Sequence, residues 1–272
     1  MTDHTPEPGP DTALGPPQLI GRTALVTGAG NGLGRAISLQ LAGAGVRVIL
    51  TGRRLAPLNE TAALIAALAA GTSRVAPVDV ADVGSVTALV AALSDEQISI
   101  LVNNAGVPGP VGPLIDIDVS EWNAVFDVNV TGMFLMCKGF LPAMIERGSG
   151  DVINLASVSG KRPLAGRTPY CASKMAVLGL TTTLAAEVGP LGITVNSLSP
   201  GPVNGPRMAR NFAMEAQRTG RTAEQARDEF AGRALLGRLL EEQEVGFAVL
   251  AMLAMPGLHA ADVDLSAGMV AR

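Results

Sequence analysis

The chain contains a single tyrosine, Tyr170, and it lies four residues before Lys174. On a helix this spacing places both side chains on one face, one turn apart. An unperturbed phenol is a poor acid or base at neutral pH, because its pKa is about 10. An ammonium group within a few ångströms favours the phenolate and lowers that pKa. We therefore predict that Tyr170 gives and takes a proton and that Lys174 adjusts its acidity.

A hydroxyl group precedes this pair by thirteen residues. Ser157 follows an apolar run over residues 152–156 that is typical of a buried strand. A hydroxyl at the end of such a strand could hydrogen-bond a substrate oxygen while Tyr170 exchanges its proton. A Tyr-x-x-x-Lys pair is common on solvated helices, however, so the interpretation depends on the elements that surround it.

A glycine-rich turn lies near the start of the chain. Residues 23–27 have the composition of a short buried strand, Gly28-Ala-Gly-Asn-Gly-Leu-Gly34 follows, and residues 35–43 are helical in composition. Glycines let a diphosphate approach the backbone, and the N-terminus of a helix offers free N–H groups and a positive dipole. The pattern predicts a dinucleotide site, with an ordinary glycine-rich turn as the alternative.

The second predicted strand, residues 46–51, ends at Gly52, Arg53 and Arg54, where the adenosine ribose of a dinucleotide would lie. A carboxylate there would bind the 2′-hydroxyl of NAD, whereas an arginine suits the 2′-phosphate of NADP. Arg53 thus favours NADP(H), with NAD(H) possible. The alternative is that both arginines are solvated loop charges.

Two further strand ends carry polar or small residues. The predicted strand 74–78 ends at Asp79, which could accept a hydrogen bond from the adenine amine; the alternative is a helix N-cap, for which Asp82 is better placed. The predicted strand 98–102 is followed by residues 103–106, Asn-Asn-Ala-Gly. Small residues there would let a flat ring lie against the backbone, whereas the asparagines could simply tie neighbouring strands together.

An amide interrupts the long apolar helix expected from about residue 120 to 145. Asn129 lies between Val128 and Val130, and an unpaired buried amide costs a few kcal/mol, on the order of 2 or more. Asn129 must therefore bind water, backbone or a neighbouring side chain.

The segment from about residue 204 to 238 differs from the rest. It is charged and contains several glycines, and its large apolar residues, Met208, Phe212, Met214 and Phe230, recur at loosely helical spacing. We predict a helical lid over a substrate. The alternative is a surface hairpin whose apolar side chains face its own core.

Repeated strand–helix units predict an α/β fold with a parallel, doubly wound sheet, buried on both faces. Further helices are expected over residues 58–70 and 244–255, and further strands over 193–198 and 262–265. Such sheets bind ligands beyond the carboxyl ends of their strands, and every motif above lies at such an end. We expect one domain over residues 21–272 after a disordered leader, residues 1–20, rich in proline and polar residues.

Composition narrows the partners. The net charge is −4, and charged residues make up only 16% of the chain, so nucleic acid and anionic membranes are not expected, whereas contact with other subunits is. Cys137 and Cys171 lie in apolar surroundings, which fits a reducing cytoplasm. The late apolar run over residues 247–255 is shorter than the about 18 residues that indicate a membrane span. His4 and His259 do not predict a metal site.

Taken in order, these motifs resemble those of the short-chain dehydrogenase/reductase family, in its single-domain branch, including 3-oxoacyl-carrier-protein reductases. The residues that carry the resemblance are Thr27-Gly-Ala-Gly-Asn-Gly-Leu-Gly34, Asp79, Asn103-Asn-Ala-Gly106, Asn129, Ser157, Tyr170-Cys-Ala-Ser-Lys174 and Pro200-Gly201. The resemblance implies a Rossmann-type seven-stranded sheet, a nicotinamide cofactor, a catalytic set of Ser157, Tyr170, Lys174 and Asn129, and a homotetramer or dimer. It also implies that Lys174 binds the nicotinamide ribose and that Asn129 holds a water in a proton relay.

Two departures bear on these expectations. Many NADP-using relatives carry a basic residue where this chain has Asn31. Near the end of the chain, relatives often read Asp-Gly-Gly where this chain has residues 266–268, Ser-Ala-Gly. The expected cofactor contacts are Gly28, Asn31, Gly32, Leu33, Gly34, Arg53, Asp79, Val80, Asn103, Ala105, Gly106, Tyr170, Lys174, Pro200, Gly201 and Val203.

The function that follows is reversible hydride transfer between a nicotinamide and a ketone or secondary alcohol, NADPH being favoured. A nucleotide-sensing module without turnover and a dehydratase or isomerase on the same fold are the alternatives.

Overall fold

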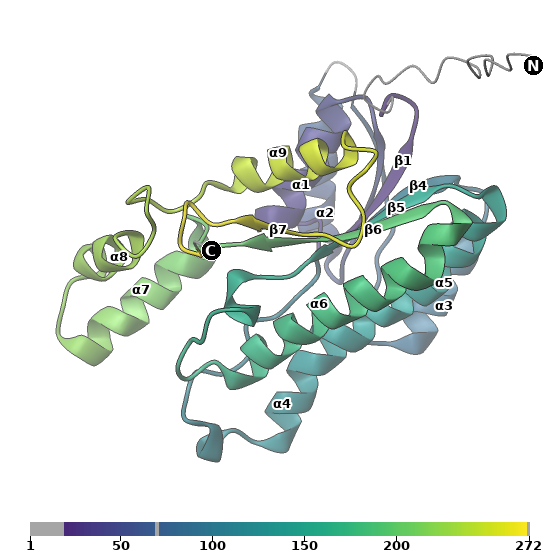
Figure 1. The fold of residues 1–272 in the computed structure, drawn as a ribbon. Coiled ribbons are helices and arrows are strands. Elements are labelled where there is room, and N and C mark those ends of the chain that lie inside the picture. The colour runs from purple at the N-terminus through teal and green to yellow at the C-terminus, as the bar shows by residue number, and fades with distance from the viewer. Residues whose placement is uncertain (1–18, 69–70, 271–272) are drawn as a thin grey trace, which may run out of the picture.

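The structure is a computed structural model that describes residues 19–68 and 71–270 (Figure 1). One parallel seven-stranded sheet has the order β3-β2-β1-β4-β5-β6-β7. Its strands are β1 (Thr23–Thr27), β2 (Arg47–Thr51), β3 (Thr72–Val75), β4 (Ile98–Asn103), β5 (Gly150–Leu155), β6 (Ile193–Pro200) and β7 (Asp262–Leu265). The predicted doubly wound parallel sheet in a single domain is confirmed, and its strand order reverses between β1 and β4.

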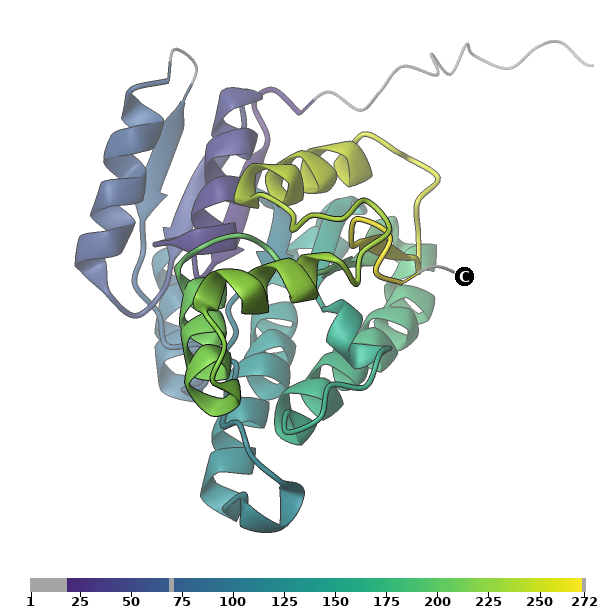
Figure 2. The ribbon, with the colours of Figure 1, turned by 90° about the vertical axis from the view of Figure 1, so that its left-hand side faces the viewer.

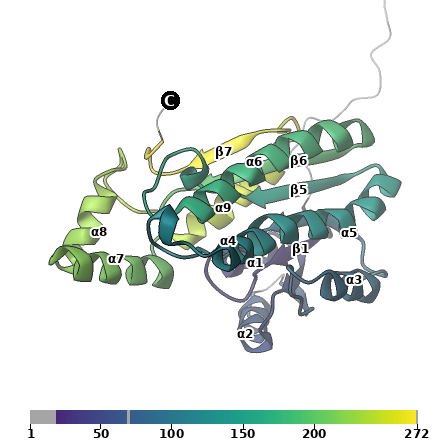
Figure 3. The same cartoon turned by 90° about the horizontal axis from the view of Figure 1, so that it is seen from below.

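Helices cover both faces of the sheet (Figures 1 and 3). The α-helices are α1 (Gly32–Gly43), α2 (Leu55–Ala66), α3 (Val83–Ala92), α4 (Val119–Phe126), α5 (Gly132–Arg147), α6 (Thr168–Val188), α7 (Pro206–Thr219), α8 (Ala223–Ala231) and α9 (Glu242–Leu253). Short turns of other helix types lie at η1 (Leu114–Asp116), η2 (Asp127–Thr131), η3 (Val158–Gly160) and η4 (Gly189–Leu191). One layer contains α1, α2 and α9, and the opposite layer contains α3, α5 and α6.

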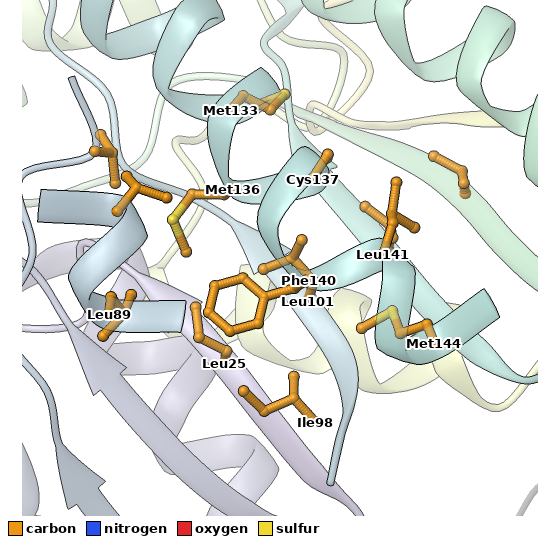
Figure 4. Close-up of a cluster of buried hydrophobic side chains, with 14 of the residues drawn as sticks. Leu25, Leu89, Ile98, Leu101, Met133, Met136, Cys137, Phe140, Leu141 and Met144 are labelled. Atoms are coloured by element: carbon orange, nitrogen blue, oxygen red, sulfur yellow. The ribbon is translucent and has the colours of Figure 1, made fainter. Parts of the chain in front are cut away.

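Alternate residues of the central strands enter different cores. Leu25 of β1 packs under α3 and α5, in the cluster with Met136 and Phe140 (Figure 4), whereas its neighbours Ala24 and Val26 pack under α1 and α9. All these residues are buried. A period of two along the strand, apolar on both sides, is what a parallel sheet covered by helices requires.

Two predicted boundaries are wrong near prolines. The third strand ends at Val75 rather than residue 78, although the amides of Ala76 and Val78, on either side of Pro77, still donate to the carbonyls of Leu50 and Gly52. Helix α2 begins at Leu55 rather than residue 58, since proline is tolerated in a first turn, where Pro57 lies. The predicted leader falls mostly on residues 1–18, outside the described residues, but Leu19 already packs against the core and accepts a hydrogen bond from the Arg22 amide.

The long helix around Asn129 is continuous from Val119 to Arg147, but its middle, η2, is a π turn. By length and composition alone this run could cross a membrane, with a mean hydropathy of 1.4 in its most apolar window. Its α5 half supplies Met133, Met136 and Met144 to the core beneath the sheet, which accounts for its apolar composition.

Helices α7 and α8 form a hairpin beyond the carboxyl ends of the strands (Figure 2). Phe212 and Ala226 form its small core, together with the partly buried Met208 and Phe230. Met214 is outside this core and 49% exposed. The hairpin thus has its own core, as the alternative interpretation expected. Met214 does not contribute to that core.

Candidate active site

Tyr170 and Lys174 lie on the first two turns of α6, which begins at Thr168 with a proline at the second position. The Lys174 side chain is almost fully buried, and its Nζ donates a hydrogen bond of 2.6 Å to the carbonyl of Leu155, the last residue of β5. The same Nζ lies 5.9 Å from the centroid of the Tyr170 ring. The predicted one-turn spacing therefore brings the cation beside the phenol.

Ser157 lies two residues beyond the end of β5 and is buried, with 8% of its surface exposed. It caps η3, because its Oγ accepts a hydrogen bond of 3.2 Å from the Ser159 amide. This turn packs directly on α6: a Cβ added to Gly160 would lie 2.9 Å from the carbonyl carbon of Lys174. The glycine thus lets the serine turn approach the Tyr–Lys helix.

Asn129 is buried within the π turn η2. Its Oδ1 accepts from the Val107 amide at 2.8 Å, and its Nδ2 donates to the Val107 carbonyl at 3.0 Å and to Ser173 Oγ at 3.0 Å. The Ser173 hydroxyl donates in turn to the Tyr170 carbonyl at 2.8 Å. The required partners of this amide are therefore the loop after β4 and the helix that carries Tyr170.

The loop after β4 brings Asn129 and Lys174 together. A Cβ added to Gly106 would lie 3.2 Å from Asn129 Oδ1 and 3.7 Å from Lys174 Nζ. A side chain at this position would therefore press against the Asn129 amide. The structure therefore brings Asn129 of η2, Ser157 at the start of η3, and Tyr170 and Lys174 of α6 to the carboxyl ends of β4 and β5.

A cleft of about 170 Å³ lies at the carboxyl ends of β1, β2 and β4, next to this cluster. The predicted cofactor residues that line it are Gly28, Asn31, Arg53, Asp79, Val80, Ala105 and Gly106. Gly30, Gly52 and Arg54, which belong to the predicted phosphate and ribose segments, also line it, whereas the lining residues that the prediction missed are Pro57, Leu58, Val78, Val107 and Val128. Pro57 was recognisable as a first-turn proline, which would have placed the start of α2 at this cleft.

The glycine-rich turn has the geometry of an anion site. Gly28 adopts a φ of +67°, and a Cβ on Gly34 would lie 2.2 Å from the Gly28 carbonyl oxygen. Asn31 precedes α1 without a side-chain cap, and the first turn of α1 contains no acidic residue. The backbone N–H groups of that turn, which includes Gly32 and Leu33, are therefore available to a phosphate.

Arg53 and Asp79 face the same cleft. Arg53 is exposed at its rim and forms no ion pair with the described residues. Asp79 Oδ1 accepts a hydrogen bond from the Ala81 amide at 3.1 Å, and Asp82 caps α3 through the Ser85 amide. The N-cap role thus belongs to Asp82, as its position predicted, and the Asp79 carboxylate lines the cleft.

The side chain of Asn103 is used inside the sheet instead. It is buried and donates to Asn154 Oδ1 at 2.9 Å and to Cys137 Sγ at 3.3 Å. Asn104 donates to the Thr27 carbonyl at 2.8 Å. Both amides therefore tie β4 to its neighbours, as the alternative interpretation expected, and neither lines the cleft.

The predicted contacts after β6 lie outside the cleft lining. Gly201 packs against β7's continuation so closely that a Cβ would lie 2.9 Å from Ser266 Cα. Val203 forms an isolated bridge with Leu240. Pro200 is the last residue of β6. These residues connect the sheet to the α7–α8 hairpin, and their contact with a cofactor stays a prediction.

Both thiols are free. Burial raises the pKa of Cys137 to about 12, although the hydrogen bond from Asn103 opposes this. Burial also raises the pKa of Cys171, against the Leu164 backbone and the Arg167 charge. A thiol with a raised pKa is a poor nucleophile near neutral pH, so a packing role for Cys171 beside Tyr170 is favoured.

Comparison with known proteins places this geometry in a known group. A family profile described as short chain dehydrogenase matches residues 22–216. The chain is 38% identical over 185 residues to a 3-oxoacyl-[acyl-carrier-protein] reductase of Vibrio harveyi, an alignment that covers 67% of this chain and 74% of the relative.

Solved structures agree. Actinorhodin polyketide ketoreductase, solved as a variant with NADPH, superposes with a TM-score of 0.86 at 33% identity and covers 91% of this chain and 97% of its own. NAD⁺-bound xylitol dehydrogenase superposes with a TM-score of 0.87 at 26% identity, covering 92% and 100%. With the family profile spanning more than half of its length, this chain belongs to the short-chain dehydrogenase family.

Proposed function

We propose that the protein transfers a hydride reversibly between the nicotinamide of NADP(H) or NAD(H) and the carbon of a ketone or secondary alcohol. Membership of the family makes it an oxidoreductase of CH–OH and C=O groups. In the direction of reduction, Ser157 holds the carbonyl oxygen and Tyr170 gives that oxygen a proton. Asn129 holds the water that returns a proton from solvent to Tyr170.

The observation that carries the proposal is the placement of Lys174. Its ammonium group is buried at the end of β5, one turn from Tyr170, with its Nζ 5.9 Å from the phenol ring. Keeping an ammonium group out of water is costly, and its position beside the chain's single tyrosine stabilises the phenolate form. A lysine with a structural role alone could keep its ammonium group in water, without this cost.

Several features of the cleft are suited to a dinucleotide. The uncapped first turn of α1 suits a diphosphate, and the close approach of Gly34 to Gly28 keeps that turn free of side chains. Gly106 lines the cleft and packs closely against Asn129 and Lys174, which brings the cleft next to both residues. When bound, the nicotinamide supplies or accepts the hydride.

We favour NADP(H) over NAD(H) because Arg53 lies at the cleft rim, where a 2′-phosphate would be neutralised. Many NADP-using relatives carry a basic residue at the position of Asn31. In this chain the preference for NADP(H) therefore depends on Arg53 and Arg54 alone. Titration of the purified chain with NADPH and with NADH, followed by nucleotide fluorescence, tests the preference. Tighter binding of NADPH supports it, and equal or tighter binding of NADH contradicts it.

Turnover separates the enzyme from its alternatives. A panel of ketones and secondary alcohols is incubated with the cofactor, and NAD(P)H absorbance and product are followed together. We expect equal amounts of cofactor consumed and product formed. Cofactor binding without turnover would identify a sensor, and product without cofactor consumption would identify a dehydratase or isomerase.

The remaining features belong to the same proposal. The segment over residues 204–238 acts as a substrate lid on a domain that spans residues 21–272. The protein works in the cytoplasm as a homotetramer or dimer, in keeping with its low share of charged residues, 16%. Sedimentation of the purified chain tests the assembly.

A further inference from the structure

A second cavity, of about 450 Å³, lies between α7 and the loop that follows β4. One wall belongs to residues 108–111 of that loop, and the other to α7. Its lining residues are Pro108, Gly109, Val111, Arg167, Arg210, Asn211, Ala213, Met214 and Gln217. The cavity therefore combines an apolar surface with two guanidinium groups.

The cavity adjoins the proposed reaction site. Residues 105–107 of the loop after β4 line the cofactor cleft, and the next residue, Pro108, lines the second cavity. Arg167 is the N-cap residue of α6, three residues before Tyr170. The cavity thus has residues within one helical turn of Tyr170 in the sequence, which places it on the side of α6 where that helix begins.

The charge of the lining is positive. Arg167 and Arg210 line the cavity, and no aspartate or glutamate is among the described lining residues. The Arg167 guanidinium is oriented by hydrogen bonds to Asn211 Oδ1 at 3.1 Å and to the Pro108 carbonyl at 3.5 Å. Because Arg167 also stands at the N-terminus of α6, the helix dipole adds to its positive potential.

The arrangement of α7 separates this charge from its own apolar core. Arg210, Ala213, Met214 and Gln217 follow the spacing i, i+3, i+4, i+7, which defines one face of a helix. Phe212 lies on a different face, in the hairpin core. Glu215 is about 100° around the helix from Met214 and is not among the lining residues. The cavity face of α7 thus presents one arginine, one glutamine and the apolar carbon of Ala213 and Met214.

We propose that this cavity binds an oxyanion at the far end of the substrate, with Arg167 and Arg210 as its partners and Val111 and Met214 against the intervening carbon chain. The inference rests on the proposed function and narrows its substrate class to oxo or hydroxy compounds that carry a carboxylate or a phosphate. Guanidinium groups suit both anions because they offer paired N–H donors.

Binding is measured first, because it does not depend on turnover. The full chain, with and without saturating oxidised cofactor, is titrated by calorimetry with pentanoate, pentanamide and pentyl phosphate. We expect at least one of the two anions to bind about tenfold more tightly than the neutral amide, and its affinity to fall as salt is added. The preferred anion identifies the substrate as a carboxylate or a phosphate. Equal binding of amide and both anions overturns the proposal.

Arginine variants locate the site. Arg210→Met removes the preference for the anion, whereas Arg227→Met, an exposed arginine on α8 of the same hairpin, leaves it unchanged. Arg167→Lys keeps most of the preference, because the charge remains, and Arg167→Met loses it. Equal effects of Arg210→Met and Arg227→Met would overturn the assignment.

Paired substrates distinguish failure of this inference from failure of the proposed function. Acetoacetate and ethyl acetoacetate differ in charge, as do dihydroxyacetone phosphate and dihydroxyacetone. We expect a higher kcat/KM for the anionic member of at least one pair and loss of that advantage in Arg210→Met. Reduction of neutral ketones with no higher kcat/KM for either anion would support the proposed function and contradict the anion site. Arginine-dependent anion binding without reduction of any carbonyl compound would support the anion site and contradict the proposed function.

Discussion

The two ends of the sheet hold their charged groups in different ways. At the amino ends, Glu96 accepts hydrogen bonds from Arg47 at 2.8 and 3.1 Å and from Arg74 at 2.9 Å, and Arg22 pairs with Asp151 at 2.6 Å. The hydrogen bond from Arg47, helped by Arg74, lowers the pKa of Glu96 to about 2. These groups neutralise one another and join strands that are distant in sequence.

At the carboxyl ends of β4 and β5, Lys174 and Asn129 are held mainly by backbone groups. Lys174 donates to the Leu155 carbonyl, and Asn129 exchanges two hydrogen bonds with the Val107 backbone. These backbone partners fix the positions of the ammonium group and of the amide, and the ammonium group lies beside the ring of Tyr170. We therefore expect the charges at the amino ends to contribute to stability and the charge of Lys174 to act on Tyr170.

Among the variants that test the difference between the two ends of the sheet, we expect loss of the Lys174 charge to have the largest effect. We expect Lys174→Met to lower kcat by about 10²–10⁴-fold, the range of general acid–base catalysis, because the phenol loses the charge that favours its ionised form. Steady-state kinetics at saturating cofactor measure the change. Lys138→Met, an exposed lysine on α5, is the control and keeps its rate. A loss of less than about threefold in Lys174→Met would show that the ammonium group does not assist the phenol.

Asn129→Ala has the next largest effect. It removes the bonds to Val107 and Ser173, and leaving such buried partners unsatisfied costs about 1–3 kcal/mol. We expect a lower unfolding temperature together with a kcat reduced by about tenfold or more, which is less than the about 10²–10⁴-fold of a direct proton-transfer group because Asn129 acts through a water. The matched control is Asn123→Ala, an exposed asparagine on α4. Reduced stability with an unchanged kcat would assign Asn129 to structure alone.

Arg53→Ala acts on the cofactor alone. We expect NADPH to bind about tenfold more weakly, since one charge-assisted pair with phosphate is lost, and NADH binding to change little. Fluorescence titration with each nucleotide gives both affinities. Equal losses for NADPH and NADH would mean that Arg53 does not contact a 2′-phosphate.

Glu96→Gln tests the amino end and has the smallest effect. We expect the free energy of unfolding to fall by about 1 kcal/mol at pH 7, because the partner arginines are partly exposed and screened. The pKa of Glu96 lies below its ordinary value of 4.5, so its contribution is present above that pH and is lost as pH falls toward 2. Denaturant unfolding at several pH values measures it. A pH-independent difference, or a large loss of kcat, would contradict the assignment.

Much of the carboxyl end could be predicted because its chemistry is local in sequence. Tyr170 and Lys174 are one turn apart, and the glycines from Gly28 to Gly34 form one turn, so short-range spacing determines their geometry. The alternation of strands and helices likewise determined the sheet. Asn103 was harder to place, because the choice between cleft and sheet interior depends on Asn154 and Cys137, which are far along the chain.

The ion pairs at the amino ends could not be predicted, because their partners are far apart in the sequence. Arg47 and Glu96 are 49 residues apart, and Arg74 and Glu96 are 22 apart, so only the folded sheet shows that these charges meet. The two faces of α7 also depend on tertiary packing. The loosely helical spacing of Met208, Phe212 and Met214 does not reveal that the first two pack against α8 while Met214 lines a cavity.

The most direct test of the central claim is the turnover of Tyr170→Phe with saturating cofactor, beside its nucleotide affinity. The phenol hydroxyl supplies the proton in this account, so kcat falls by at least about 10²-fold while cofactor affinity changes by less than about threefold. A near-normal kcat in a protein that binds the nucleotide normally would contradict the proposed proton route.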